Sequence, residues 1–190
     1  IGFLAGEGLP VIWRGPMVSN MLQQMLNQVA WPELDYLVID LPPGTGDTQL
    51  TLCQMAPVNA SVIVTTPQDI SLIDAHRGLE MFRKLNVPVL GLIENMSGFT
   101  CSHCGEVTHI FRQGGGERIA AELDLPMLGS LPLDPAVVVS GDEGEPIVLR
   151  DPTSIGARAF FGVARAVSAR IREENARNAD AGEADLNLKW

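Results

Sequence analysis

Short β-rich apolar runs alternate along this chain with segments of helical periodicity. A parallel strand that is buried on both faces reads as a continuous apolar run, and a helix usually makes the crossover to the next strand. The alternation therefore predicts an α/β fold, in which helices flank a parallel β-sheet on both faces. The expected strands are residues 36–39, 61–65, 88–93 and 127–131, with two short candidates at 1–5 and 11–13.

The expected helices begin at residues that favour helix starts. Pro16 suits the first turn of a helix, Asp47 is expected to cap the next one, and Ser71 resembles the start of a capping box. The first helix carries an apolar stripe at helical spacing, which we interpret as core packing. The stripe comprises Met17, Val18, Met21, Leu22, Met25, Leu26 and Val29. The other helices are expected at 47–56, 71–85, 117–123 and 153–172.

Composition and charge exclude several classes of protein. The chain has 190 residues, of which 46% are hydrophobic and 19% charged, as in one globular domain with a proper core. The formal net charge of −10 argues against nucleic-acid binding, and no apolar run is long enough to span a membrane. Three cysteines and no visible signal peptide favour a cytoplasmic location. Residues 1–172 are expected to form the domain, and the acidic stretch 173–190 is expected to be a disordered tail.

The strand expected at 36–39 ends in a carboxylate, Asp40, and then breaks into a loop rich in proline and glycine. Ligands bind at the carboxyl ends of parallel strands, so Asp40 is well placed to hold Mg²⁺, directly or through water. The loop that contains Gly44 and ends at Asp47 would then lie near a terminal phosphate. The alternative is a strand and a tight turn whose aspartate caps the following helix.

A Cys-x-x-Cys motif, from Cys101 to Cys104, follows the strand expected at 88–93 in a loop that ends in Gly105. Two thiolates at this spacing can share one metal ion or cluster. The pair could equally be a redox couple, half of a zinc site, half of an iron–sulfur site or a chance pairing. Cys53 is distant in the chain and is interpreted as a small core residue.

A closed zinc or cluster site generally needs four ligands, and this loop offers two thiolates. The simplest completion is a second copy of the loop from a twofold-related subunit, which places four cysteines at a homodimer interface. The competing completion uses His103 or His109 within one chain and would favour zinc. The alternative for both histidines is an exposed loop position without a metal.

The combination of the Asp40 segment and the cysteine loop resembles the Mrp/Nbp35 family of iron–sulfur cluster carriers, deviant P-loop NTPases related to MinD and the ParA proteins. The resemblance extends to about residue 170 and implies a three-layer α/β/α fold of the MinD type. The matching segments are residues 13–17, 35–47, 65–68, 94–97, 101–104 and 129–134.

This resemblance implies an ATP-dependent protein that binds a [4Fe–4S] cluster between two subunits and transfers it to apo-proteins. Cys101 and Cys104 would ligate the cluster. Asp40 would be the Walker B aspartate, and Gly44 and Asp47 would belong to switch II. The residues implied to contact the adenine base are Asn95, Pro132, Leu133 and Asp134. An asparagine amide can both donate to adenine and accept from it, although Asn95 is explained equally well as a turn former.

The chain departs from that family because it contains no lysine-bearing phosphate loop. No Gly-Lys-Ser or Gly-Lys-Thr occurs, and residues 114–117 lack the lysine and hydroxyl that contact phosphate and Mg²⁺. The sequence therefore looks like the C-terminal part of such a protein, and we expect it not to hydrolyse ATP at a useful rate. Two other classes remain, namely a MinD/ParA-like regulatory ATPase and a zinc-stapled dimeric binding module. The acidic charge and the absence of a basic amphipathic helix argue against DNA or a membrane as partner.

Overall fold

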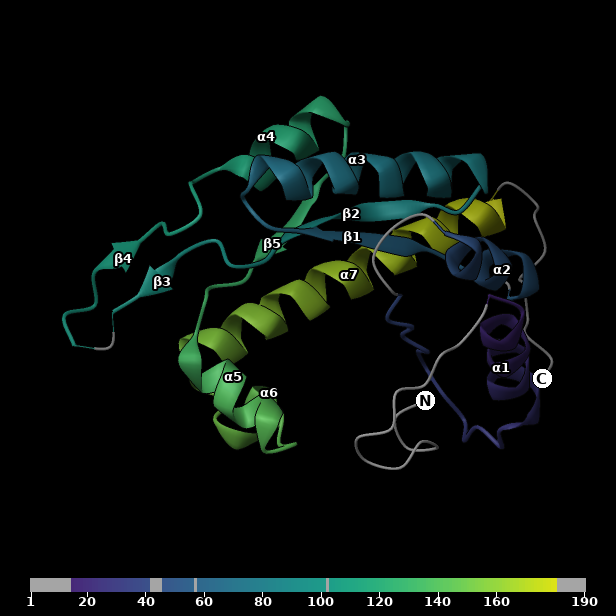
Figure 1. Cartoon of the computed structure of the whole chain (residues 1–190), viewed down its shortest axis with the longest axis horizontal. Helices are drawn as coiled ribbons and strands as arrows, with labels where there is room; N and C mark the ends of the chain where they lie inside the picture. Colours follow the sequence, from purple (N-terminus) through teal and green to yellow (C-terminus); the bar gives the residue numbers. More distant parts are fainter. Residues whose placement is uncertain (1–14, 42–45, 57, 102, 181–190) are drawn as a thin grey trace. The chain divides into compact units, whose positions relative to one another are not determined.

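Three of the four longer strands expected from the sequence form a parallel sheet in the computed structural model (Figure 1). They are β1 (Ser61–Thr65), β2 (Val89–Glu94) and β5 (Met127–Ser130), in the order β1-β2-β5. At the carboxyl ends of the strands, Glu94 of β2 is aligned with Thr65 of β1 and with Ser130 of β5. The predicted α/β class with a parallel sheet is confirmed.

The structure describes residues 15–41, 46–56, 58–101 and 103–180. They belong to two compact units, one within Ile1–Pro57 and Leu188–Trp190 and the other within Val58–Asn187. The strand candidates at 1–5 and 11–13 lie outside the described residues. Among the described residues, no helix combines the length and the apolar character that crossing a bilayer requires.

Helices cover both faces of the sheet in the second unit (Figure 1). On one face lie α3 (Asp69–Lys84) and α4 (Gly115–Glu122), and on the other lies α7 (Ile155–Asp180). Leu79 of α3 and Leu92 of β2 have no exposed surface, and full burial of each such side chain stabilises the fold by roughly 1.5–3 kcal/mol. This arrangement is the three-layer fold that the sequence predicts.

The opposite core lies between the sheet and α7. Its buried residues are Leu90, Ile93, Leu128 and Leu131. Val163 and Val167 of α7 pack against them. Gly129 makes the close approach possible, since its φ is +152° and a Cβ there would lie 2.7 Å from Val163 Cγ2.

Two helix starts differ from the prediction. The second helix, α2 (Asp47–Met55), has Gly46 rather than Asp47 in the N-cap position. Helix α3 begins at Asp69 after Gln68, so the capping box expected at Ser71 is wrong. The Ser71 hydroxyl lies inside the first turn of α3 and accepts a 2.7 Å hydrogen bond from the hydroxyl of Thr66.

The strand expected at 36–39 is wrong in this structure, where these residues are not in a strand and Val38 is 89% exposed. Strand formation depends on pairing and packing more than on side-chain type. The described part of the first unit contains the helices α1 (Gly15–Gln28) and α2 and offers this segment no strand to pair with.

The apolar stripe of α1 is only partly packed. Leu26 is buried, whereas Met17 and Val29 are about half exposed, at 51% and 47%. The interpretation of the whole stripe as core is therefore wrong, because apolar residues at helical spacing are buried only where another element covers that face.

Helix α7 continues past the end expected near residue 172, through Asp180. Residues 173–180, expected to belong to a disordered tail, are thus helical. Arg170 and Glu173 form an ion pair at 2.8 Å, and Arg177 and Glu174 form another at 3.3 Å. Such pairs three residues apart add a few tenths of a kcal/mol to a helix.

Four short elements were not expected from the sequence. They are β3 (Phe99–Thr100), β4 (Val107–Thr108), α5 (Pro135–Asp142) and α6 (Ile147–Arg150). The first two carry the cysteine motif, and the last two border a groove.

Candidate functional site

The two motif cysteines lie at the end of a short hairpin that leaves the sheet after β2. Strands β3 and β4 pair antiparallel, with Phe99 opposite Thr108 and Thr100 opposite Val107. The hairpin projects away from the sheet and its helices (Figure 1). Cys101 follows β3 directly, so the motif forms the turn of the hairpin.

Main-chain hydrogen bonds close this turn. The Cys101 N–H donates to the Glu106 carbonyl at 2.9 Å, and the Gly105 N–H donates to the Cys101 carbonyl at 2.8 Å. Gly105 has φ +74°, a left-handed conformation that glycine adopts without strain. Both thiols are free, with Cys101 half-buried and Cys104 exposed. The turn therefore presents two partly or fully exposed cysteines between residues joined by main-chain hydrogen bonds.

The surroundings of Cys101 favour its thiolate form. The backbone N–H of Cys104 lowers the pKa of the Cys101 thiol most, followed by the N–H of His103 and the Cys104 side chain, against a small opposing effect of burial. Hydrogen bonds to a charged form stabilise that form, and the thiolate is the form that binds metals. Burial instead raises the pKa of the Cys53 thiol, which suits a packed residue. Of these two thiols, Cys101 is thus the one whose surroundings favour the thiolate.

The two histidines near the motif do not complete a site in this chain. Within the described ranges, no group of three or more His, Cys, Asp or Glu residues is arranged to hold a metal ion. His103 lies in the exposed turn, and His109 Nδ1 lies 2.8 Å from the Ser97 carbonyl at the base of the hairpin. The structure therefore does not bring either histidine together with the cysteines as a set of ligands.

The hairpin base is joined to the chain that follows β5. The Ser97 N–H donates to the Leu131 carbonyl at 3.0 Å, and the Leu133 N–H donates to the Gly98 carbonyl at 2.8 Å. Phe99 and Leu133 form a further parallel bridge. These contacts place the segment that contains Leu133, one of the residues expected to line the adenine base, directly beside the base of the cysteine hairpin.

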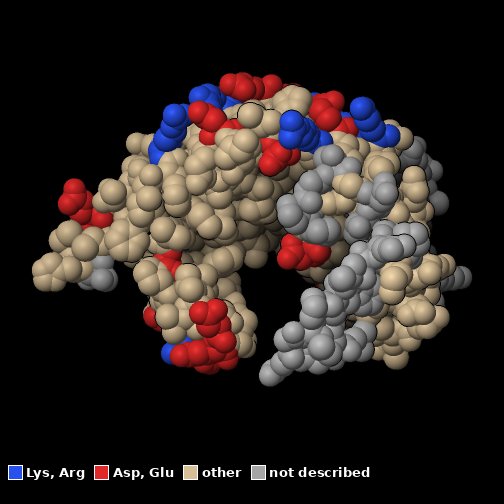
Figure 2. Space-filling view, in the orientation of Figure 1, with Lys and Arg blue, Asp and Glu red and all other residues tan. Residues whose placement is uncertain are grey.

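Exposed ion pairs link the chain that follows the hairpin, and α4 after it, to the start of α3. Arg112 follows β4, and Arg118 lies in α4; both pair with Asp69 at the start of α3, with Arg118 at 3.0 Å. The hydrogen bond from Arg118 and the charge of Arg112 lower the pKa of the Asp69 carboxyl. Lys and Arg are interspersed with Asp and Glu over this face of the second unit (Figure 2).

The carboxyl edge of the sheet gathers the other predicted site residues of the second unit. Asn95 follows β2, and its N–H donates to the Thr65 carbonyl at 2.7 Å. Its Oδ1 accepts from the Met96 N–H at 2.9 Å, which leaves the amide NH₂ as a donor. Pro132, Leu133 and Asp134 follow β5 and are half-buried. The structure thus brings Asn95 and this segment to the same edge of the sheet.

Asp134 also has a local role in the fold. Its Oδ1 accepts the Ala136 N–H at 2.9 Å, which makes it the N-cap of α5. An aspartate in this position stabilises a helix by about 1 kcal/mol. Capping therefore accounts for this side chain without a ligand.

Glu94 was not singled out in the sequence. Its carboxylate is buried at the end of β2 and accepts the Gly116 N–H at the start of α4. Helix N-termini favour negative groups, so this contact fastens α4 to the sheet. The sequence signal that could have identified Glu94 is its position as an acidic residue at the end of an apolar strand. The glycine run at 114–116, which lacks the features of a phosphate loop, serves this close packing.

The three residues expected to act at the phosphates belong to the first unit. Asp40 is exposed and not at the end of a strand, Asp47 is the first residue of α2, and Gly44 lies outside the described residues.

The parallel sheet and its two helical layers define a three-layer α/β protein, and its similarity to solved structures assigns it to the P-loop NTPase fold class. A nucleotide-binding protein from Archaeoglobus fulgidus, solved in complex with ADP, has a similar fold, with a TM-score of 0.62 and 39% sequence identity. The match covers 67% of this chain and 53% of that one. MinD from Pyrococcus horikoshii, solved with Mg-ADP, has a TM-score of 0.62 at 21% identity, and the match covers 87% of this chain and 63% of MinD. The latter similarity concerns the fold alone.

A ParA-type family model, described as NUBPL iron-transfer P-loop NTPase, matches residues 1–168. The chain belongs to this family, which confirms the resemblance found in the sequence. An iron–sulfur cluster carrier protein of Pseudomonas fragi is 54% identical over 81% of this chain and 54% of its own length. The mouse iron–sulfur cluster transfer protein NUBPL is 49% identical over 90% of this chain and 54% of its own. The chain spans about half the length of these relatives.

Proposed function

We propose that this chain is the cluster-binding part of an iron–sulfur carrier, which holds a [4Fe–4S] cluster between two copies and passes it to apo-proteins. The observation that carries the proposal is the hairpin turn with Cys101 and Cys104. It offers two partly or fully exposed cysteines, a stabilised thiolate and no third ligand within the described residues. The names of the relatives support the same cargo.

The proposal includes a homodimer, because a [4Fe–4S] cluster takes four thiolates and one turn supplies two. A twofold axis beside the turn would bring the second pair without any change in the fold. The exposed position of Cys104 at the end of a projecting hairpin supports this arrangement. Free thiols of this kind suit the reducing cytoplasm, which we propose as the location.

The proposal also includes ATP in the complete protein. Asn95 would donate its amide NH₂ to the adenine ring, and Pro132, Leu133 and Asp134 would line the base. Asp40 would hold Mg²⁺, with Gly44 and Asp47 in the loop that senses the terminal phosphate. Backbone N–H groups and a lysine must hold the triphosphate, and this sequence contains no such loop. ATP hydrolysis is therefore proposed for the complete protein and not for these 190 residues.

Anaerobic reconstitution with iron and sulfide tests the cargo. We expect broad visible absorbance and about four irons per dimer, since the cluster contains four iron atoms. Cys101→Ser and Cys104→Ser should each abolish cluster binding and the dimer together. Cys53→Ser is the matched control and should leave both unchanged. Stoichiometric zinc that iron cannot replace would contradict the carrier and favour a zinc-stapled binding module.

A further inference from the structure

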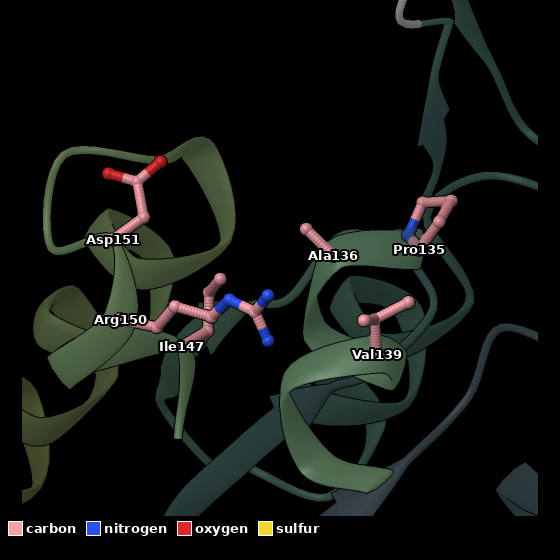
Figure 3. A pocket seen from close by; sticks show the side chains of 6 residues that line it. All are labelled: Pro135, Ala136, Val139, Ile147, Arg150 and Asp151. Carbon is pink, nitrogen blue, oxygen red and sulfur yellow. The ribbon is translucent and has the colours of Figure 1, made fainter. Parts of the chain in front are cut away.

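A groove of about 330 Å³ lies between α5 and α6, outside the site described above (Figure 3). Pro135, Ala136 and Val139 of α5 form one wall, and Ile147 lies in the other. Arg150 extends from α6 toward Ala136 and Val139 (Figure 3). The groove is thus mainly apolar along its walls, with Arg150 reaching across it and the Asp151 carboxylate also in its lining.

Specific contacts build this groove. Asp134 caps α5. Gly156, at the start of α7, lets α5 and α7 approach each other, because a Cβ there would lie 2.9 Å from both Asp134 Oδ2 and Val137 Cγ2. Arg150 is ion-paired with Glu143, so its charge is compensated within the groove. The walls are therefore held in place by the fold.

Apolar side chains of the two helices that form the groove are exposed. Val139 in its wall is 48% exposed, and Leu149 of α6 is 74% exposed. Exposed apolar side chains on elements that form a concave surface are typical of sites that bind another chain.

The segment that forms the groove is acidic. From residue 134 to residue 151 the chain has five acidic residues and one basic residue, and the basic one, Arg150, is already paired. The acidic residues are Asp134, Asp142, Glu143, Glu145 and Asp151. Figure 2 shows acidic side chains gathered on the lower part of the second unit, where α5 and α6 lie. Such a surface complements a partner that carries apolar side chains flanked by Lys or Arg.

We propose that this groove docks a basic amphipathic segment of the recipient apo-protein. Its position supports that occupant, since α5 begins two residues after Leu133, whose N–H donates to Gly98 at the base of the cysteine hairpin. A recipient held here would lie next to the hairpin that carries the cluster. The identity of the partner as a recipient rests on the proposed carrier function, whereas the preference for a basic amphipathic segment does not.

A fluorescein-labelled helical peptide of leucine and lysine, with leucines at i, i+3, i+4 and i+7, tests the groove by anisotropy. Its scrambled form and a leucine–glutamate version are the reference peptides. Val139→Arg places a charge in the groove and should weaken binding at least about tenfold, as loss of a central apolar contact does. Val138→Arg is the matched control on the same helix, since Val138 is 57% exposed but does not line the groove. Equal losses in the two variants, or none in Val139→Arg, would overturn the proposal.

The acidic charges of this segment give a second measurement that does not change the apolar walls. The exposed pair Asp142→Asn and Glu145→Gln should weaken binding of the leucine–lysine peptide more than that of the leucine–glutamate peptide. A uniform effect on both peptides would count against charge complementarity. Circular dichroism establishes that each variant is folded.

Cluster transfer from the reconstituted chain to an apo-[4Fe–4S] enzyme tests the identity of the partner. Val139→Arg should slow the recovery of enzyme activity relative to Val138→Arg at equal cluster content. Equal rates would refute a recipient in the groove, and a change from dimer to monomer in Val139→Arg would assign the groove to a second copy instead. If the wild-type chain takes up no cluster, the proposed function fails, while the peptide titration still decides the groove.

Discussion

Helix α4 begins so close to the carboxyl ends of β1 and β2 that one added methyl group should measurably destabilise the fold. A Cβ at Gly115 would lie 2.5 Å from the Pro67 carbonyl oxygen and 3.0 Å from its Cα, whereas ordinary contacts begin at 3.4 Å. The neighbour is backbone and cannot rotate away, so Gly115→Ala has to open this contact by roughly 0.9 Å.

The expected cost follows from these distances. Overpacking of this kind costs about 1–3 kcal/mol, and the shift also weakens the hydrogen bond from Gly116 to Glu94. Alanine in a helix recovers about 0.5–1 kcal/mol relative to glycine. We therefore expect a net loss of about 2 kcal/mol in the free energy of unfolding, since the unfavourable contributions are the larger.

Urea unfolding followed by circular dichroism measures this loss. With a slope of about 2 kcal/mol per molar urea, the midpoint should fall by about 1 M. Gly162→Ala in α7 is the matched control, because no atom lies within 4 Å of its added Cβ. That variant should be more stable than the wild type by about 0.5–1 kcal/mol. If Gly115→Ala behaves like Gly162→Ala, the reasoning about close packing is wrong.

Three further outcomes are expected. Cys101 should react with iodoacetamide at a lower pH than an ordinary thiol, and Cys53 should react last. Peptide mass spectrometry follows both reactions, and equal rates for the two cysteines would contradict the lowered pKa of Cys101. The pKa of Asp69 is lowered by the hydrogen bond from Arg118 and a second arginine, so its stabilising contribution is present above its unfolded-state pKa and lost as the pH falls through the folded-state value. Asp69→Asn should therefore flatten the acid limb of stability against pH, and an unchanged limb would refute the assignment. Glu94→Gln should lower the unfolding free energy by about 1–2 kcal/mol, because the hydrogen bond from the Gly116 N–H to a charged acceptor becomes one to a neutral acceptor. An unchanged urea midpoint would show that the charge contributes nothing.

The sheet strands were predictable because their sequences are short, continuous and apolar. The expected bounds of β1, β2 and β5 agree with the structure to within one residue at each end. Residues 36–39 have the same character but find no partner strand among the described residues of their unit, and no property of the residues themselves reports that. A strand-like sequence therefore forms a strand only where a neighbouring strand is available to pair with it.

Helix α5 shows the converse case. Three consecutive valines, at 137–139, are β-branched and favour strands, yet they are helical here. The Asp134 cap and Pro135 in the first turn start the helix, and the packing of Gly156 against Val137 holds it. Those tertiary contacts cannot be read from local propensity.

For the site, residue types were more predictable than their connections. The cysteine motif, Asn95 and residues 132–134 were all found in the sequence. The contacts that link them are main-chain bonds, such as that from Leu133 to Gly98, and side-chain identity does not reveal them. The roles of all these residues remain predictions, as do those of Asp40, Gly44 and Asp47 in the first unit.

The cysteine turn is closed by bonds that use only groups of the chain itself. The Cys101 N–H reaches Glu106 and the Gly105 N–H reaches the Cys101 carbonyl, so the shape of the turn does not depend on what the sulfurs hold. A pre-organised turn pays little conformational entropy on loading. For the carrier proposed above, the same property would matter in the reverse step. Delivery of a cluster would leave no change of main-chain hydrogen bonding to undo before the next cluster is bound.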